Sequence, residues 1–409
     1  MNQQISKFDA HPARIIPFDL GRTLSSKDID NLNNHLSSQY TLKELSTRQK
    51  SILKNCILIF SINSQVDGFI FKNGLCVVVI EDEIIDLRND FTRFSIIYGE
   101  KRKKAHSDLF NWTHSHSNAV DTVIRTLRDI VKKNTQKKDS LRKSSSAEFE
   151  NRGLSYVMTL SFFDMSDKLS GFENYPQWLK NNLHALLNPA LLYLEDSNKF
   201  STENKSHSYL EKLLNEMRST DVPHDFEHHS HIDTYMSWSA VIAIGQLLAS
   251  DREEYIALEV QLQSDWYYVY CLEKDFDESH SLSKQKIIEI QRLHYDLELL
   301  ENRLLDFDDT SLPTRVLNLQ KGMVETSAIT KNILHLQKKL QFLLEREQLN
   351  NEMKQKKLAQ SSEILLFIIT CIELAPTLTE YGNKLFPYAG IMASCLVFLI
   401  GLILLIRKN

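Results

Sequence analysis

Glycine and proline are scarce in this chain, which has 11 glycines and 8 prolines among 409 residues. Both residues interrupt helices and strands, so their scarcity predicts an ordered, helix-rich protein. Cysteine is also rare. The five cysteines are odd in number and no motif pairs them, which argues against a disulfide framework and fits a reducing cytoplasm. The first 20 residues hold no long apolar core, so we expect no signal peptide.

An excess of positive charge is missing too. The chain has 48 basic and 53 acidic residues and a net charge of -5, so we expect no direct binding of nucleic acid. It contains no nucleophile elbow, phosphate-binding loop, dinucleotide fingerprint, zinc motif or kinase signature. We therefore do not expect an enzyme.

Short apolar runs rich in β-branched residues predict a sheet within residues 1–280. The clearest runs lie at 52–62 and 68–86, and the second contains Asn73 and Gly74, a pair typical of hairpin turns. These patterns predict a cytoplasmic α+β or α/β sensor domain. Further strands are expected at 91–98, 156–163 and 238–244, and helices at 25–44, 119–131, 178–194 and 253–270.

Residues 281–357 predict a helical hairpin with a coiled-coil-like stalk. A helix at 283–307 is followed by cap-type residues, and Pro313 suits the first turn of the next helix. That helix is expected to continue to about residue 380, because the only proline inside it, Pro376, lies near its end. Its first part carries apolar residues at the spacing of a coiled-coil seam: Val316, Leu319, Met323, Ile329, Ile333, Leu336, Leu340 and Leu343.

Residues 358–409 predict two transmembrane helices. The second, at 387–406, has 20 residues without a charge, which is long enough to span a bilayer. Basic residues precede the first segment and follow the second, so both termini are expected to be cytoplasmic, in a bacterial inner membrane. The first segment is less apolar, which leaves the alternative that 364–374 is an interfacial or juxtamembrane helix and only the last segment, 387–406, spans.

Polar residues of the first segment fall on one helix face. Carboxylates at membrane depth normally face a bundle interior or a water-filled path, so this face predicts the lining of a cation pore. The predicted pore-lining residues are Glu363, Thr370, Glu373, Thr377 and Glu380.

A histidine cluster precedes the strand expected at 238–244. It comprises His224, His228, His229 and His231. A metal site needs side chains that converge from fixed elements, but neighbouring histidines point apart, which favours an exposed or core-satisfied set. A metal site and a pH-sensitive loop stay open as alternatives.

The C-terminal layout resembles that of CorA-type divalent-cation channels. The long stalk, the two apolar segments and the turn at Tyr381, Gly382 and Asn383 carry the resemblance, although this family has a Met between the Gly and the Asn. The resemblance implies a homopentameric channel for a divalent cation such as Mg²⁺. It also implies gating by divalent ions at acidic sites, for which Asp306, Asp308 and Asp309 are the candidates.

The large cytoplasmic region also resembles a divergent CorA-like subgroup found beside type III CRISPR systems. Members of that subgroup are antiviral membrane effectors activated by a nucleotide messenger, so the resemblance implies a nucleotide ligand, to which no residues can be assigned. The alternative function is a membrane-anchored coiled-coil scaffold that conducts no ions.

Overall fold

The computed structural model describes residues 8–86, 117–133, 158–165, 232–236, 240–277, 284–305, 312–385, 388, 391–392, 395–396 and 398–399. The chain divides into two compact units, Met1–Gln337 (unit 1) and Lys338–Asn409 (unit 2). The predictions at 91–98, at 178–194 and for the histidine cluster lie outside the described residues.

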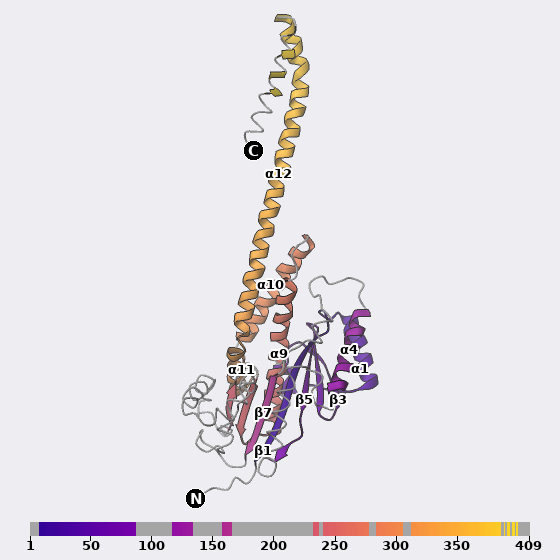
Figure 1. Cartoon of the computed structure of the whole chain (residues 1–409), viewed down its shortest axis with the longest axis vertical. Helices are drawn as coiled ribbons and strands as arrows, with labels where there is room; N and C mark the ends of the chain where they lie inside the picture. Colours follow the sequence, from indigo (N-terminus) through magenta and orange to yellow (C-terminus); the bar gives the residue numbers. More distant parts are fainter. Residues whose placement is uncertain are drawn as a thin grey trace, which may run out of the picture. The chain divides into compact units, whose positions relative to one another are not determined.

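Unit 1 is built on a mixed sheet (Figure 1). The strand order is β2-β3-β4-β5-β1-β7-β9-β8, and β6 also pairs with β1. Only β7 and β9 run parallel among the pairs of the described residues. The strands are β1 (Phe8–Asp19), β2 (Thr41–Lys43), β3 (Cys56–Asn63), β4 (Val66–Phe71), β5 (Leu75–Glu81), β6 (Ile85–Asp86), β7 (Met158–Met165), β8 (Ile232–Met236) and β9 (Ala240–Gly245).

The central strand, β1, was not predicted from the sequence. It lies between β5 and β7 and contains Pro12 and Pro17, which pair with Ser161 and Val77. Proline cannot donate a ladder hydrogen bond and normally argues against a central strand. The residues around these prolines are nevertheless buried, including Ile15 and Phe18, so burial on both faces outweighs the lost donors.

The predicted hairpin is confirmed. The turn between β4 and β5 contains Asn73 and Gly74, and Gly74 has a positive φ of 83°, which glycine adopts without strain. The preceding strand passes close to β3, where a Cβ atom on Gly68 would lie 2.3 Å from Cζ of Phe60. A side chain at position 68 would therefore force the buried ring of Phe60, on the paired strand, to move.

Helices cover both faces of the sheet (Figure 1). On one face, α1 (Ser26–Gln39) and α4 (Ser117–Lys133) bury Leu32, Leu36 and Ile124 in a core with Phe18 and Phe60. On the other face, α9 (Ala249–Asp277) packs against β1, β5 and β7. The helices predicted at 119–131 and 253–270 and the strands predicted at 156–163 and 238–244 are thus confirmed.

In the described part of the chain, α9 is followed by α10 (Lys284–Leu305), α11 (Thr314–Ser327) and α12 (Ile329–Leu385). The predicted continuous helix from Pro313 is wrong, because Ala328 takes a left-handed conformation (φ 54°, ψ 20°) and separates α11 from α12. Residues of the predicted seam are buried from Val316 to Leu340. Gln337 of α12 donates a hydrogen bond to Glu301 of α10 (3.1 Å), as expected where two helices of a hairpin meet.

The predicted membrane region requires a correction. Among the described residues, no helix is both long enough and apolar enough to cross a bilayer. Carboxylates at Glu363, Glu373 and Glu380 bound and interrupt the apolar part of α12. The predictions of two transmembrane helices, a multi-pass membrane protein and a membrane ion channel are therefore contradicted for the part of the chain that the structure describes, while 387–406 lies mostly outside it.

The predicted turn after the first apolar segment is also wrong. Tyr381, Gly382 and Asn383 continue the backbone of α12, which ends at Leu385. A single glycine lowers helix stability by about 1 kcal/mol, which flanking helix can offset. The three residues therefore do not form the loop on which the resemblance to CorA-type channels depends.

Candidate functional site

Four helices of unit 1 enclose a cavity of about 610 Å³. It lies among α2 (Thr47–Ile52), α9, α10 and α11, on the side of α9 that faces away from the sheet. Its apolar wall comes mainly from α9 and α11, and its polar groups from α9, α10 and the residues after α2. The residues that line it include Ser51, Ile52, Lys54, Asn55, Leu258, Gln261, Leu262, Asp265, Asn302, Arg303, Leu304, Leu305, Leu312, Gln320, Met323 and Val324.

A partly buried ion pair lines this cavity. Nη2 of Arg303 on α10 lies 2.5 Å from Oδ1 of Asp265 on α9, and Nε2 of Gln261 donates to the other oxygen, Oδ2, at 2.9 Å. Burial raises the pKa of the Asp265 carboxyl, and Arg303 and Gln261 partly counter this effect. Both carboxylate oxygens are thus occupied, and the guanidinium of Arg303 is held against the cavity.

One buried polar atom at the cavity has no hydrogen-bond partner among the described residues. The Oε1 atom of Gln261 is buried and accepts no hydrogen bond from any residue that the structure describes. Asn302 and Gln320 also contribute side-chain amides to the lining. Buried polar groups are normally satisfied, so the unpaired oxygen of Gln261 is typical of a site completed by water or by a ligand.

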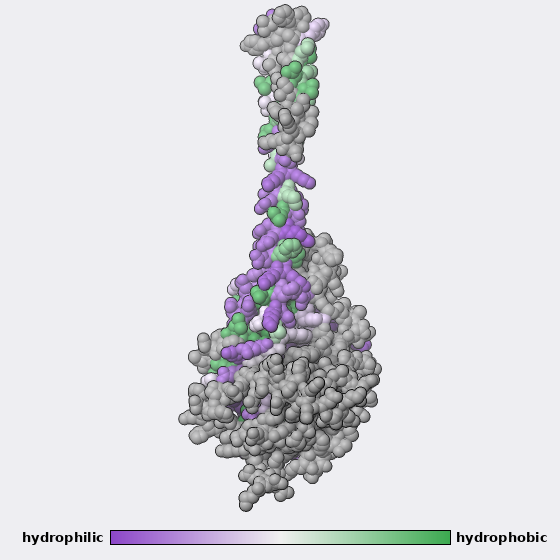
Figure 2. All heavy atoms as spheres, turned by 60° about the vertical axis from the view of Figure 1, so that its left-hand side comes forward, coloured by the Kyte–Doolittle hydropathy of each residue, from purple (hydrophilic) through white to green (hydrophobic). Residues whose placement is uncertain are grey.

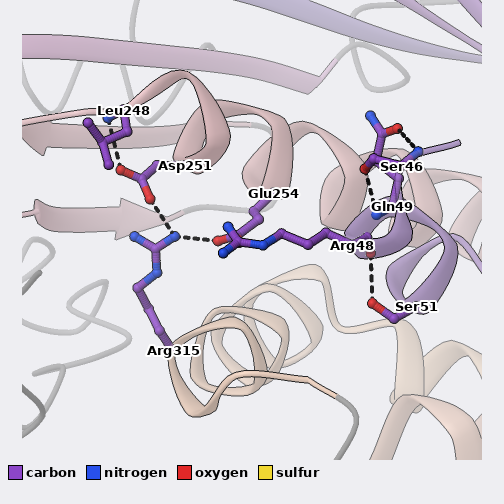
Figure 3. Close-up of polar contacts among 8 residues, drawn as sticks. All are labelled: Ser46, Arg48, Gln49, Ser51, Leu248, Asp251, Glu254 and Arg315. Carbon is purple, nitrogen blue, oxygen red and sulfur yellow. Dashed lines mark hydrogen bonds and ion pairs between the residues drawn. The ribbon is translucent and has the colours of Figure 1, made fainter.

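Beside the cavity, two arginines and two carboxylates connect the same helices (Figure 3). We call Arg48, Asp251, Glu254 and Arg315 the carboxylate clamp. Nη2 of Arg315 on α11 lies 2.7 Å from Oδ1 of Asp251 and also pairs with Oε2 of Glu254, both on α9. Nη1 of Arg48 on α2 lies 2.8 Å from the second oxygen of Glu254. Burial would lower the pKa of Arg315, but the carboxylates raise it above its ordinary value.

Local capping places the members of the clamp. Ser46 and Gln49 form a capping box at the start of α2, in which Ser46 Oγ accepts from Gln49 N and Gln49 Oε1 accepts from Ser46 N (Figure 3). This box fixes the first turn of the short helix that carries Arg48. At the start of α9, the Asp251 carboxylate accepts from Leu248 N at 2.9 Å, so one side chain caps the helix and pairs with Arg315.

The clamp and the cavity share three helices. Leu258 lies one turn after Glu254 on α9, and Ser51 lies three residues after Arg48 on α2. Residues three or four apart lie on the same face of a helix. The clamp therefore fixes the spacing of three of the helices that enclose the cavity.

A second buried carboxyl, Glu259, lies on α9 outside the cavity lining. The side chain is fully buried and accepts a hydrogen bond from Gln263 Nε2 at 2.8 Å, whereas its Oε2 atom has no hydrogen-bond partner among the described residues. Burial raises its pKa to about 7. The group serves no evident purpose at the cavity, but it makes the folded state sensitive to pH.

The residues predicted to line a pore lie on α12 in unit 2. Glu363, Thr370, Glu373, Thr377 and Glu380 are all exposed in the single chain. Their pore-lining role stays a prediction. The candidate gating residues Asp306, Asp308 and Asp309 lie outside the described residues, and within the described part no group of three metal-binding side chains occurs.

Sequence reasoning missed the cavity and the clamp. Asp265 and Arg303 are 38 positions apart, and nothing in their spacing indicates that they pair. One usable signal was present, because Glu254, Gln261 and Asp265 are polar residues within the helix predicted at 253–270, which is otherwise rich in apolar and aromatic residues. Polar side chains in such a helix need partners, which predicts contacts with other elements.

Comparison with known proteins adds no relative. No family model, no curated protein and no solved structure matches the chain. The resemblance to CorA-type channels and to their CRISPR-associated subgroup therefore stays a prediction from the sequence.

Proposed function

We propose that unit 1 is a small-molecule-binding sensor domain and that the cavity among α2, α9, α10 and α11 is its binding site. The main support for this proposal is the cavity itself. Its volume of about 610 Å³ lies in the range of ligand sites, which are about 300–1,000 Å³ and combine apolar walls with a few placed polar groups. The Asp265–Arg303 pair and the amides of Gln261, Asn302 and Gln320 supply those groups.

The carboxylate clamp supports this proposal. A cavity that must be opened before binding reduces affinity, whereas one that is already formed does not. Because the clamp ties α2 and α11 to α9, the cavity keeps its shape without a ligand. The predicted gating ligands, a nucleotide messenger or a divalent ion, stay predictions, and nucleotides belong among the compounds to be tested.

A thermal-shift screen of small molecules, including nucleotides, tests the proposal on the full chain. Gln320→Trp places a large side chain at the lining and should abolish the shift given by any compound that binds there. Lys321→Trp is the matched control, because Lys321 is the exposed neighbour of Gln320. Compounds that stabilise the wild type and the Lys321→Trp variant but not the Gln320→Trp variant support the site. Equal shifts in all three chains contradict it.

A separate observation favours self-association of α12. Figure 2 shows apolar side chains on the surface toward the C-terminal end of this helix, after a largely hydrophilic stretch. Six large apolar side chains between residues 358 and 374 are exposed in the single chain: Leu358, Leu365, Leu366, Ile369, Ile372 and Leu374. A patch of this kind marks an interaction surface. We propose a further copy of this chain as the partner, because every copy carries the same helix and one such helix can bury the apolar stripe of another.

The native mass of the purified protein tests this second proposal. We expect a multiple of the 47.5 kDa chain mass, and the predicted pentamer would give five times that value. Leu365→Lys combined with Leu366→Lys should reduce the mass toward one chain. Gln360→Lys combined with Ser362→Lys changes exposed polar positions nearby and should leave it unchanged. A wild type that is monomeric at micromolar concentration would contradict self-association.

A further inference from the structure

We infer that the ligand of the cavity is an amphipathic organic anion, with a carboxylate- or phosphate-type group bound at Arg303 and an apolar body against α9 and α11. This inference rests on the proposed function of the cavity. It adds the chemical class of the ligand, which neither the volume nor the location of the cavity specifies.

The contacts and the exposure of the Arg303 guanidinium support this inference. A guanidinium has five N–H donors, and the described contacts of Arg303 involve one of its terminal nitrogens, which pairs with Asp265. About a quarter of the side-chain surface is exposed, compared with 5% for Asp265. Asp265 therefore pairs with one nitrogen of the guanidinium, and the rest of the guanidinium belongs to a side chain that lines the cavity. Arginine binds carboxylate and phosphate groups through pairs of such donors.

The charge of the lining agrees with an anion. Two cationic residues, Lys54 and Arg303, and one anionic residue, Asp265, line the cavity. The amides of Asn302 and Gln320 add neutral N–H donors. A cationic ligand fits poorly, because the two oxygens of Asp265 are already occupied by Arg303 and Gln261.

The apolar part of the lining is suited to an apolar body. It comprises Ile52, Leu258, Leu262, Leu312, Met323 and Val324, all of which are buried. Such side chains bind hydrocarbon or aromatic surface but cannot hydrogen-bond a sugar or a peptide backbone. A ligand that contacts both the polar and the apolar side chains of the lining therefore has a charged end and an apolar end.

A matched pair of fluorescent probes tests the inference on the full chain. 8-Anilinonaphthalene-1-sulfonate and N-phenyl-1-naphthylamine share an apolar ring system, but only the first carries an anionic group. We expect the sulfonate to bind the wild type about tenfold more tightly, which corresponds to roughly 1.4 kcal/mol from a charged hydrogen bond. Gln320→Trp measures the binding of both probes outside the cavity, for example to α12, and that contribution is subtracted.

Substitution of Arg303 should remove the preference for the anion. Arg303→Met alone leaves Asp265 buried without its cation and can fail to fold, so the informative chain is Asp265→Asn combined with Arg303→Met. We expect both probes to bind this double variant with equal affinity. Arg303→Lys should retain part of the preference, and Lys321→Met, which removes an exposed cation nearby, should retain all of it.

Competition then distinguishes the two kinds of anion. Decanoate, decyl phosphate and decanol share one alkyl chain, and we expect decanoate, decyl phosphate or both to displace the sulfonate probe while decanol does not. Equal binding of both probes to the wild type, or an unchanged preference in the double variant, overturns the inference but leaves the binding site intact. Failure of both probes to bind the cavity, while the compound screen also yields no ligand sensitive to Gln320→Trp, overturns the proposed function itself.

Discussion

At the scale of single residues, Glu259 shows how a buried charge makes stability depend on pH. Its carboxyl is fully buried, its one described hydrogen bond comes from Gln263, and burial raises its pKa from 4.5 to about 7. The folded protein therefore holds a proton that the unfolded chain releases above its own pKa. Stability must fall as the pH rises from about 4.5 to 7, and the loss is complete above that range.

Glu259→Gln should remove this dependence. The difference between 4.5 and about 7 corresponds to roughly 3 kcal/mol as an upper limit, so the variant should be more stable than the wild type at pH 8 and similar to it at pH 4.5. Urea denaturation at a series of pH values measures the effect. Glu253→Gln, which changes an exposed carboxyl on the same helix, is the control and should keep the slope of the wild type. Identical slopes for the wild type and Glu259→Gln would show that the carboxyl is not buried.

Residues also explain what the sequence could not predict about β1. The patterns at 52–62 and 68–86 are apolar and β-branched, and they correctly predicted β3, β4 and β5. In β1, two prolines and Arg14 interrupt the apolar pattern that would mark a buried strand. Their local preferences oppose a central position, and only long-range pairing with β5 and β7 overrides them.

At the scale of elements, the carboxylate clamp determines how α2 and α11 pack on α9. Its two arginines are not equivalent, because the side chain of Arg315 is 24% exposed and that of Arg48 is 64% exposed. Arg315 contacts both carboxylates, whereas Arg48 contacts only Glu254. Most of the compensating charge therefore comes from Arg315.

Arg315→Met should destabilise unit 1 far more than Arg48→Met. Removal of Arg315 leaves two largely buried carboxylates without their main cation, which costs about 3 kcal/mol or more, whereas loss of an exposed pair costs at most about 1 kcal/mol. The difference should appear in urea denaturation monitored by far-ultraviolet circular dichroism. Replacement of both carboxylates together with Arg315, as Asp251→Asn, Glu254→Gln and Arg315→Met, should recover part of the loss. An Arg48→Met variant as unstable as Arg315→Met would contradict this account.

The junction between α11 and α12 is the second feature that belongs to the scale of elements. Apolar spacing predicts the buried seam on both sides of Ala328 correctly, but it carries no information on the left-handed backbone at this residue. Ser327 and Ala328 are ordinary helix residues, so no local signal marks the break. The sequence therefore predicted one helix where the structure has two.

Ala328→Gly should stabilise the protein by about 1 kcal/mol. A left-handed conformation costs alanine about 1–2 kcal/mol relative to a helical one, and glycine avoids most of that cost. Ala257→Gly, inside α9, is the opposite case and should destabilise by at least about 1 kcal/mol. Both values come from urea denaturation, and a destabilising effect of Ala328→Gly would mean that α11 and α12 are continuous.

At the scale of the whole molecule, two kinds of surface carry the proposed function. Unit 1 provides a preformed cavity between helices, and unit 2 provides exposed apolar side chains on α12. The sequence predicted the α/β region and the long C-terminal helix. It did not predict the cavity, because the cavity exists only where four helices distant in sequence come together.

The prediction of two membrane spans was wrong for the described part of the chain, because apolar composition alone does not make a helix a membrane span. Apolar residues after 358 led to the prediction of two membrane spans, whereas the described part of α12 does not meet the requirements of a span. Polar residues recur in that part of the helix, among them Thr370 and Glu373. The apolar residues between them can equally be buried against another copy of the chain.

Hydrogen exchange measured by mass spectrometry, with and without a compound from the thermal-shift screen, tests the central claim most directly. We predict slower exchange in peptides from α2, α10, α11 and the 258–265 part of α9, and no such change in the Gln320→Trp variant. Ligand binding stabilises the structure around its site by mass action, so the affected peptides identify that site. Protection that is absent from these helices, or that persists in Gln320→Trp, would show that the cavity is not the binding site.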